Sequence, residues 1–113
     1  MKRVFYYIAA IISADLLNSS AFAGEVIGTV STLNARASDN LHLVTLNGTY
    51  SGTSPSCATH NYMMIKDENS TAGKSQYAML MSAWLAGKSV RVIGAGTCTR
   101  WSDGEDIESI IFQ

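Results

Sequence analysis

Four acidic side chains lie close together near the end of the chain: Asp103, Glu105, Asp106 and Glu108. A pair of carboxylates can supply the acid and the base or nucleophile of glycoside hydrolysis. The same cluster offers oxygen ligands for calcium. The stretch, however, is a turn leading into a strand, where solvated acids are ordinary, and it lacks the spacing of a calcium loop. Both chemistries are therefore disfavoured.

Cys57 and His60 form a second pattern with chemical potential, Cys-x-x-His. A zinc site would need two more ligands at suitable spacing, and only Cys98 and His42 remain. A Cys–His nucleophile would need Cys57 as a free thiol. The glycines of "IGAGT" follow a strand pattern without a helix after them, so no phosphate-binding loop is expected. The sequence thus favours a protein that is not an enzyme and needs no metal or cofactor.

The first 23 residues have the features of a secretory signal peptide. Lys2 and Arg3 precede the apolar run "VFYYIAAIISADLL", and Ala21-Phe22-Ala23 is a small-x-small cleavage site. The alternative, a membrane anchor, is disfavoured because the run is short and Asp15 interrupts it. We expect residues 1–23 to be removed and residues 24–113 to form one secreted domain, exported through the periplasm of a Gram-negative bacterium.

The two cysteines of the chain, Cys57 and Cys98, both lie in the expected secreted domain. Two cysteines in a secreted protein most simply form one disulfide bond, so we predict that these two are paired. The net charge is −1 and no basic stripe is present, so nucleic acid is an unsuitable partner.

The pattern of β-branched residues and turn residues predicts a mostly β domain with one helix. Asp39-Asn40 and Asn47-Gly48 are turn signals. Asp67, Asn69, Ser70 and Thr71 can each cap a helix that follows them. The expected strands are residues 25–33, 41–47, 57–65, 89–96, 97–101 and 107–112. A five-stranded Greek-key barrel with its helix after the third strand is the arrangement of the OB-fold.

The predicted helix, "SQYAMLMSAWLAGK" (residues 75–88), has no charged residue before its final lysine. Helical spacing predicts that Tyr77, Leu80, Met81 and Trp84 face the barrel. The opposite face would carry small and apolar residues, for which a second subunit is the simplest cover. These candidate oligomer residues are Ala78, Met79, Ser82, Ala83 and Ala86.

The second half of the chain resembles the binding (B) subunits of pertussis-like bacterial toxins, including the subtilase-cytotoxin and typhoid-toxin groups. The resemblance rests on "YAMLMSAWLAGKSVRVIGAGTCTRWSDGEDIESIIF": a helix ending in Gly-Lys, a Val-Arg-Val strand, a Thr-Cys segment and a Trp-Ser-Asp turn. It implies an OB-fold subunit in a ring-shaped homopentamer that binds host cell-surface glycans, some of them sialylated. The ring would deliver a separate catalytic A subunit, often an ADP-ribosyltransferase. The helices would line its pore.

Two exposed polar stretches with an aromatic residue fit the glycan binding that this resemblance implies. The candidates are Arg100, Trp101, Ser102 and Asp103 in one stretch and Tyr50, Ser51 and Thr53 in the other. Trp101 has an alternative role, packing beside the disulfide. The serine and the aromatic residue that contact sialic acid in relatives align with Ile27 and Gly94, so that pocket is not carried over. A second interpretation is a secreted inhibitor or adaptor that binds another protein through the helix.

Overall fold

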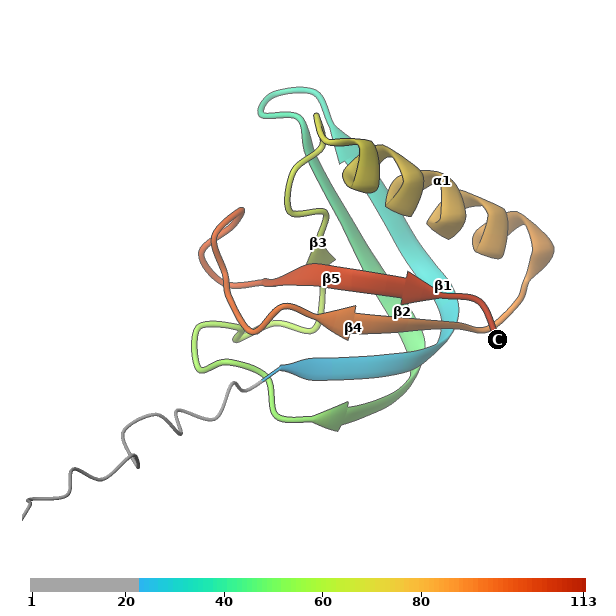
Figure 1. The fold of residues 1–113 in the computed structure, drawn as a ribbon, viewed down its shortest axis with the longest axis horizontal. Helices are drawn as coiled ribbons and strands as arrows, with labels where there is room; N and C mark the ends of the chain where they lie inside the picture. The colour runs from blue at the N-terminus through green and yellow to red at the C-terminus, as the bar shows by residue number, and fades with distance from the viewer. Residues whose placement is uncertain (1–22) are drawn as a thin grey trace, which may run out of the picture.

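The computed structural model describes residues 23–113, in which five strands form a closed barrel beside one helix (Figure 1). The elements are β1 Gly24–Arg36, β2 Leu41–Gly52, β3 Met63–Met64, α1 Thr71–Ala86, β4 Val90–Gly94 and β5 Glu105–Ile111. The prediction of a mostly β chain with one helix is confirmed. Except for Ala23, the expected signal peptide lies outside the described residues. Within residues 23–113, no helix has the length and apolar character needed to cross a membrane.

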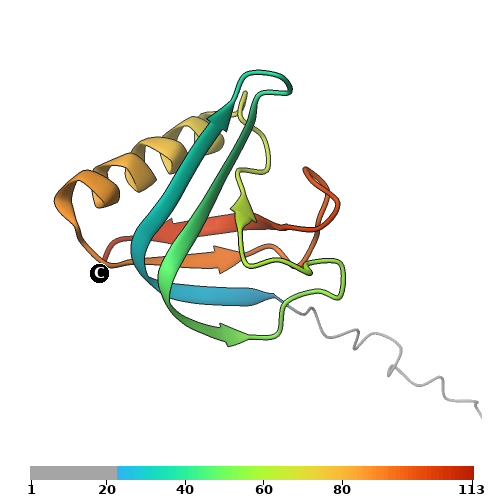
Figure 2. The ribbon, with the colours of Figure 1, turned by 180° about the vertical axis from the view of Figure 1, so that it is seen from behind.

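The strands follow one another around the barrel in the order β1-β2-β3-β5-β4, and β4 pairs with β1 to close it. All pairings are antiparallel except β3 with β5, which is parallel. The helix therefore connects β3 to β4 across one side of the barrel, as Figures 1 and 2 show. The connections β2–β3 and β4–β5 lie together at the barrel end away from the C-terminus of α1.

The long ribbon of β1 and β2 bends sharply to wrap around the barrel (Figure 2). Its turn lies at residues 37–40, where Asn40 adopts a positive φ of 60°. The prediction of a turn at Asn47-Gly48 is wrong, because Gly48 pairs with Gly28 in the middle of the ribbon. A Cβ on Gly28 would lie 2.3 Å from the Asn47 carbonyl oxygen, so only glycine permits this close approach.

The predicted Cys57–Cys98 disulfide is confirmed. The predicted strand at 57–65 is largely wrong, because only Met63–Met64 pair with neighbours and the preceding residues form a loop. That loop is bound to the β4–β5 connection by the disulfide and by N–H groups of Thr59 and His60 that donate to the Asp103 carbonyl. Residues 97–101 form no strand, and only a single bridge joins Trp101 to Gly104.

Helix α1 has a specific cap at each end. The Ser70 hydroxyl accepts from the Gly73 N–H at 2.9 Å, which satisfies one free donor of the first turn. At the other end Gly87 adopts the left-handed conformation with a φ of 65°, and its N–H donates to the Trp84 carbonyl, which is typical of a C-terminal cap. Ser70 is one of the four predicted capping candidates, and Gly87 is the predicted end of the helix. The predicted start at Ser75 is wrong, because the helix begins at Thr71, directly after this cap.

The faces of α1 differ from the prediction. Leu80 is fully buried and Ala83 is almost so, whereas Trp84 is 55% exposed and Met81 is also exposed. Ala83 therefore packs in this subunit's own core and is not on the free face. Met79 is partly buried against that core. The reason is size: small residues let the helix lie close to the barrel, and the bulky Trp84 is excluded.

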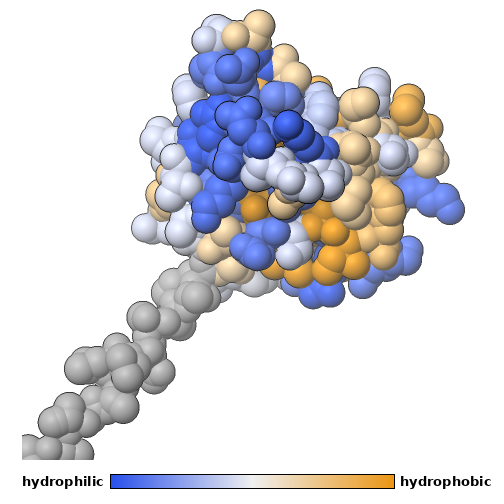
Figure 3. All heavy atoms as spheres, turned by 45° about the horizontal axis from the view of Figure 1, so that its top comes forward, coloured by the Kyte–Doolittle hydropathy of each residue, from blue (hydrophilic) through white to orange (hydrophobic). Residues whose placement is uncertain are grey.

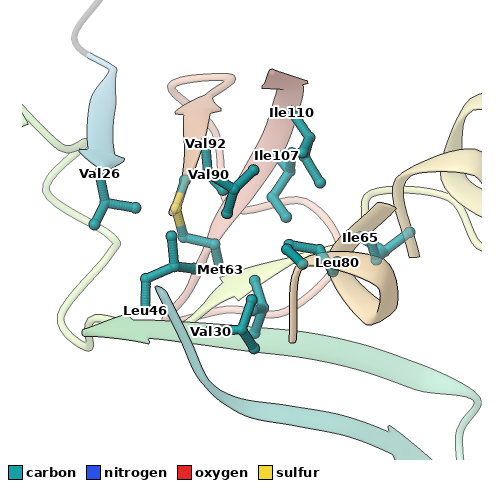
Figure 4. Packing of buried hydrophobic residues seen from close by; sticks show 12 residues of the cluster. Val26, Val30, Leu46, Met63, Ile65, Leu80, Val90, Val92, Ile107 and Ile110 are labelled. Atoms are coloured by element: carbon teal, nitrogen blue, oxygen red, sulfur yellow. The ribbon is translucent and has the colours of Figure 1, made fainter. Parts of the chain in front are cut away.

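The barrel interior is filled by one cluster of aliphatic side chains, drawn from every strand and from α1 (Figure 4). Its members include Val26, Val30, Leu46, Met63, Leu80, Val90, Val92, Ile107 and Ile110. Leu80 projects from the helix toward the side chains of β1 and β5. The helix is thereby fixed on one side of the barrel by its own core contacts.

The outer face of α1 remains apolar and uncovered in the single subunit. Leu85 is 78% exposed, and Met81 and Trp84 lie exposed on the same helix. Hydrophobic residues gather on the side of the molecule where α1 ends (Figure 3). A hollow of about 350 Å³ adjoins them, lined by Ser82, Ala83, Ala86, Lys88, Ser89, Phe112 and Gln113. The face expected to need cover is thus larger and more apolar than the sequence indicated.

Candidate functional site

The β2–β3 loop, the start of β1, the end of β2 and the start of β5 surround an open cavity of about 270 Å³ at one end of the barrel. Its wall is formed by Gly24, Glu25, Tyr50, Ser54, Ala58, Thr59, His60, Asn61, Tyr62, Met63 and Glu105. Pockets for drug-sized ligands span roughly 300–1,000 Å³. A space slightly smaller than that range has room for one small ring, such as a single sugar unit.

His60 and Tyr62 line this cavity, and Trp101 lies near the Tyr62 hydroxyl without lining it; we call these three residues the aromatic cluster. The rings of His60 and Tyr62 are stacked, with centroids 5.1 Å apart and planes 5° from parallel. The guanidinium carbon of Arg36 lies 4.8 Å from the centre of the Trp101 ring. Planar rings held against a cavity offer apolar faces on which a ligand ring can stack.

Asp103 holds the aromatic cluster in place from the β4–β5 connection. The Tyr62 hydroxyl donates to its Oδ1 at 2.5 Å, and His60 Nδ1 lies 3.4 Å from its Oδ2. The bond to Asp103 is the largest cause of the raised pKa of Tyr62, and burial adds to it; Trp101 and Arg36 oppose it less strongly. Tyr62 therefore remains a protonated hydroxyl whose oxygen can still accept from a ligand.

The structure places the residues of the two predicted glycan stretches differently. Tyr50 lines the cavity and its hydroxyl donates to the Asn61 carbonyl at 2.9 Å. Trp101 belongs to the aromatic cluster, and Asp103 contacts two of its members, Tyr62 and His60. Ser51, Thr53 and Ser102 are exposed and do not line the cavity.

Arg100 has a structural environment of its own. Its Nε donates to Glu68 Oε1 at 2.9 Å, and its Nη2 donates to the Asp39 carbonyl at 2.8 Å. Burial alone would raise the pKa of Glu68, but the bonds from Arg100 and from the His42 N–H outweigh it and lower the pKa. Arg100 thus ties the β1–β2 turn to the segment before α1 and does not face the cavity.

His60, Tyr62 and Arg36 are the site residues that sequence reasoning missed. His60 was considered only as a metal ligand or catalytic partner of Cys57, and residues 57–65 were expected to form a strand. The signal that could have located them is the disulfide itself, since it brings the segment after Cys57 against the segment after Cys98.

The acidic cluster of the sequence separates into different environments. Glu105 and Asp106 are buried, whereas Glu108 is exposed and Asp103 is part of the site. In the described part of the chain, no three acidic, histidine or cysteine side chains come close enough to hold a metal ion.

Asp106 organises the β4–β5 connection with its buried carboxylate. It accepts from the hydroxyls of Thr97 and Thr99 at 2.6 and 2.7 Å, and from the N–H groups of Thr99 and Arg100 at 2.8 and 3.0 Å. Burial alone would raise the pKa of Asp106, but these donors outweigh it and the pKa is lowered. The ionised carboxylate is therefore the form that holds residues 97–100 of the β4–β5 connection in position.

We expect Asp106→Asn to lower the free energy of unfolding at neutral pH by about 2–3 kcal/mol, because hydrogen bonds to a charged acceptor are lost. Because the pKa of Asp106 is lowered in the folded state, its ionised carboxylate stabilises the fold at pH values above 3.8, the ordinary pKa of an aspartate. This stabilisation is lost as the pH falls through the folded-state pKa. Urea unfolding at several pH values should therefore show the gap between wild type and variant closing in acid. A gap that is the same at pH 3 and pH 7 would contradict this role.

Comparison of the chain with protein-family models, with curated proteins and with solved structures finds no match.

Proposed function

We propose that this protein is the glycan-binding B subunit of a secreted AB toxin, an OB-fold subunit that assembles as a ring of five. The observation that carries the proposal is the closed barrel β1-β2-β3-β5-β4 with one helix between β3 and β4 whose outer face is apolar and exposed. A five-stranded barrel of this kind supports the OB-fold part of the proposal. The disulfide agrees with an extracellular or periplasmic location.

The ring is supported by the outer face of α1. Ala78, Ser82 and Ala86 are small and exposed, so a neighbouring helix can approach closely, and Leu85 and Trp84 can then be covered. Burial of one leucine side chain contributes roughly 1.5–3 kcal/mol. A head-to-tail contact repeated around a closed ring forms this contact once for every subunit. The helices would then line a central pore, where the tail of the A subunit would bind.

Glycan binding is supported by the cavity and the aromatic cluster. A sugar ring in the cavity would stack on the paired rings of His60 and Tyr62, and its hydroxyls would donate to carboxylate and carbonyl oxygens of the wall. The carboxylates of Glu25 and Glu105 line the wall, and Asp103 lies behind Tyr62.

The catalytic A subunit belongs to the proposal through the resemblance to pertussis-like toxins, in which it is a separate chain and often an ADP-ribosyltransferase. A reading frame beside this one that encodes a secreted ADP-ribosyltransferase or protease would support it. The ring alone would bind cells without modifying any substrate.

The glycan site is tested by an array that carries both neutral and sialylated glycans. We expect wild type to bind a subset of them and Tyr62→Ala to lose about tenfold or more of that binding, since stacking and orienting groups at the centre of a site dominate its affinity. Tyr62→Phe keeps the stacked ring and should lose less. Glu108→Gln, on the exposed side of β5, should bind as wild type does.

Thermal unfolding of the same variants separates loss of the site from loss of the fold. If Tyr62→Ala remains folded and still binds the array as strongly as wild type, the cavity is not the glycan site.

A second candidate function is a secreted inhibitor or adaptor that binds another protein. The exposed Trp84 and Leu85 favour it, because aromatic and aliphatic anchors on one helix face suit a groove of a partner. This function predicts a monomer or dimer and no signal on the glycan array.

A further inference from the structure

Glu105 is a buried carboxylate that has no basic side chain beside it among residues 23–113. It is only 2% exposed, and none of the ion pairs found among residues 23–113 includes it. Buried charges are normally paired with an opposite charge, because removal from water is costly. The donors that the structure gives it are both backbone N–H groups, those of Gly24 and Gly96.

The Gly24 nitrogen donates to both carboxylate oxygens of Glu105, at 3.2 Å to Oε1 and 3.1 Å to Oε2. The Gly96 N–H donates to Oε2 at 2.9 Å. The backbone is held tightly against this carboxylate: a Cβ on Gly94 would lie 2.0 Å from Oε2, and one on Gly24 would lie 2.9 Å from Oε1. A single N–H shared between two carboxylate oxygens is a weak arrangement for a neutral amide, but it suits an ammonium group.

Gly24 is also the residue that follows the expected signal-peptidase site. Cleavage hydrolyses the Ala23–Gly24 peptide bond: water supplies the hydroxyl of the new Ala23 carboxyl group and a proton to the Gly24 nitrogen. The resulting amine takes a further proton from solvent and becomes an α-ammonium with three N–H donors. Cleavage therefore places a positive charge at the nitrogen that already contacts Glu105.

We propose that the Gly24 α-ammonium created by processing binds the Glu105 carboxylate as an internal ion pair, and that this pair fixes β1 to β5 in the secreted protein. Both residues line the cavity described above, so processing also completes one wall of that cavity. The pair rests on cleavage after Ala23 and does not depend on the identity of a ligand or on the ring.

The test compares two chains that begin at Gly24 and differ only in its nitrogen, one free and one acetylated. Both can be made by joining a synthetic peptide of residues 24–56 to a segment that begins at Cys57. The acetyl carbonyl takes the place of the Ala23 carbonyl, which accepts from the Thr53 N–H at 3.2 Å, so the acetylated chain fits the same space. It keeps the N–H donor to Glu105 and the acceptor for Thr53 but lacks the charge, and the comparison in Glu105→Gln accounts for the contribution of the acetyl group itself.

We expect acetylation to lower the equilibrium constant for folding about tenfold or more, measured by urea unfolding at one protein concentration, because breaking a buried pair is costly. In the Glu105→Gln variant, acetylation should change the equilibrium constant for folding by less than about twofold. Glu108 is an exposed carboxylate on the same strand, so in the Glu108→Gln variant acetylation should lower the equilibrium constant by as much as in wild type. An equal effect in wild type and Glu105→Gln overturns the proposal.

A second measurement on wild type alone applies if Glu105→Gln fails to fold. The free Gly24 amine should react with an amine reagent more slowly than the exposed Lys66, Lys74 and Lys88, because an ion-paired ammonium is held protonated. An α-amine that reacts faster than these lysines overturns the proposal. These measurements test only the ion pair, and the glycan array tests the proposed glycan site independently of them.

Discussion

Replacing both Cys57 and Cys98 with serine should lower the free energy of unfolding by about 4 kcal/mol, less any strain that the bridge imposes on the folded state. The bond closes a loop between residues 41 positions apart, so its loss frees much conformational entropy in the unfolded chain. A barrel of this size buries a limited core and depends strongly on such a link. Urea unfolding of the wild type in its oxidised form and of the variant measures the difference.

The disulfide variant should also lose affinity for glycan. The bridge joins the loop that carries His60 and Tyr62 to the connection that carries Trp101 and Asp103, so the aromatic cluster depends on it. The single variants Cys57→Ser and Cys98→Ser serve as controls and should resemble the double variant. A loss below about 1 kcal/mol would show that the loop closure contributes little and that the core alone stabilises the barrel.

Leu85→Asp should dissociate the ring while leaving each subunit folded. Leu85 is 78% exposed in the single chain, so the subunit loses no internal contact, whereas an interface would have to bury a charge. Without five linked sites, binding to a glycan-coated surface should fall by about 10²- to 10⁴-fold, although each single site is unchanged. Sedimentation and surface binding of wild type and variant measure both effects.

Leu85→Met is the matched control for this experiment, because it keeps an apolar side chain of similar size and should retain the ring. If Leu85→Asp sediments as wild type does, then the outer face of α1 is not the subunit interface.

The sequence was sufficient to predict the elements that local rules determine. The β-branched strands and the Gly87 helix end depend on residue type and short-range spacing. The Cys57–Cys98 bond followed from the presence of only two cysteines in the sequence. The prediction of a turn at Asn47-Gly48 was wrong because the close contact between Gly48 and Gly28 also requires glycine at this position. Residue type alone does not distinguish these two uses.

The candidate site was harder to predict because it is built from segments that are distant in sequence. The cavity wall combines the start of β1, the end of β2, the loop after Cys57 and the start of β5. The helix face was misjudged for a related reason: apolarity suggested Trp84 for the core, but the space available at the barrel accepts Ala83. Both the site and the orientation of the helix depend on the distances between elements. The periodicity of the sequence gives no information about these distances.

The mass of the processed wild-type protein in solution tests the account most directly, measured by light scattering at micromolar concentration. We predict particles of about five times the subunit mass, because a head-to-tail contact through α1 closes into a ring. A protein that remains a monomer at that concentration, with Met81, Trp84 and Leu85 in contact with water, would contradict the proposed ring and the toxin assignment built on it.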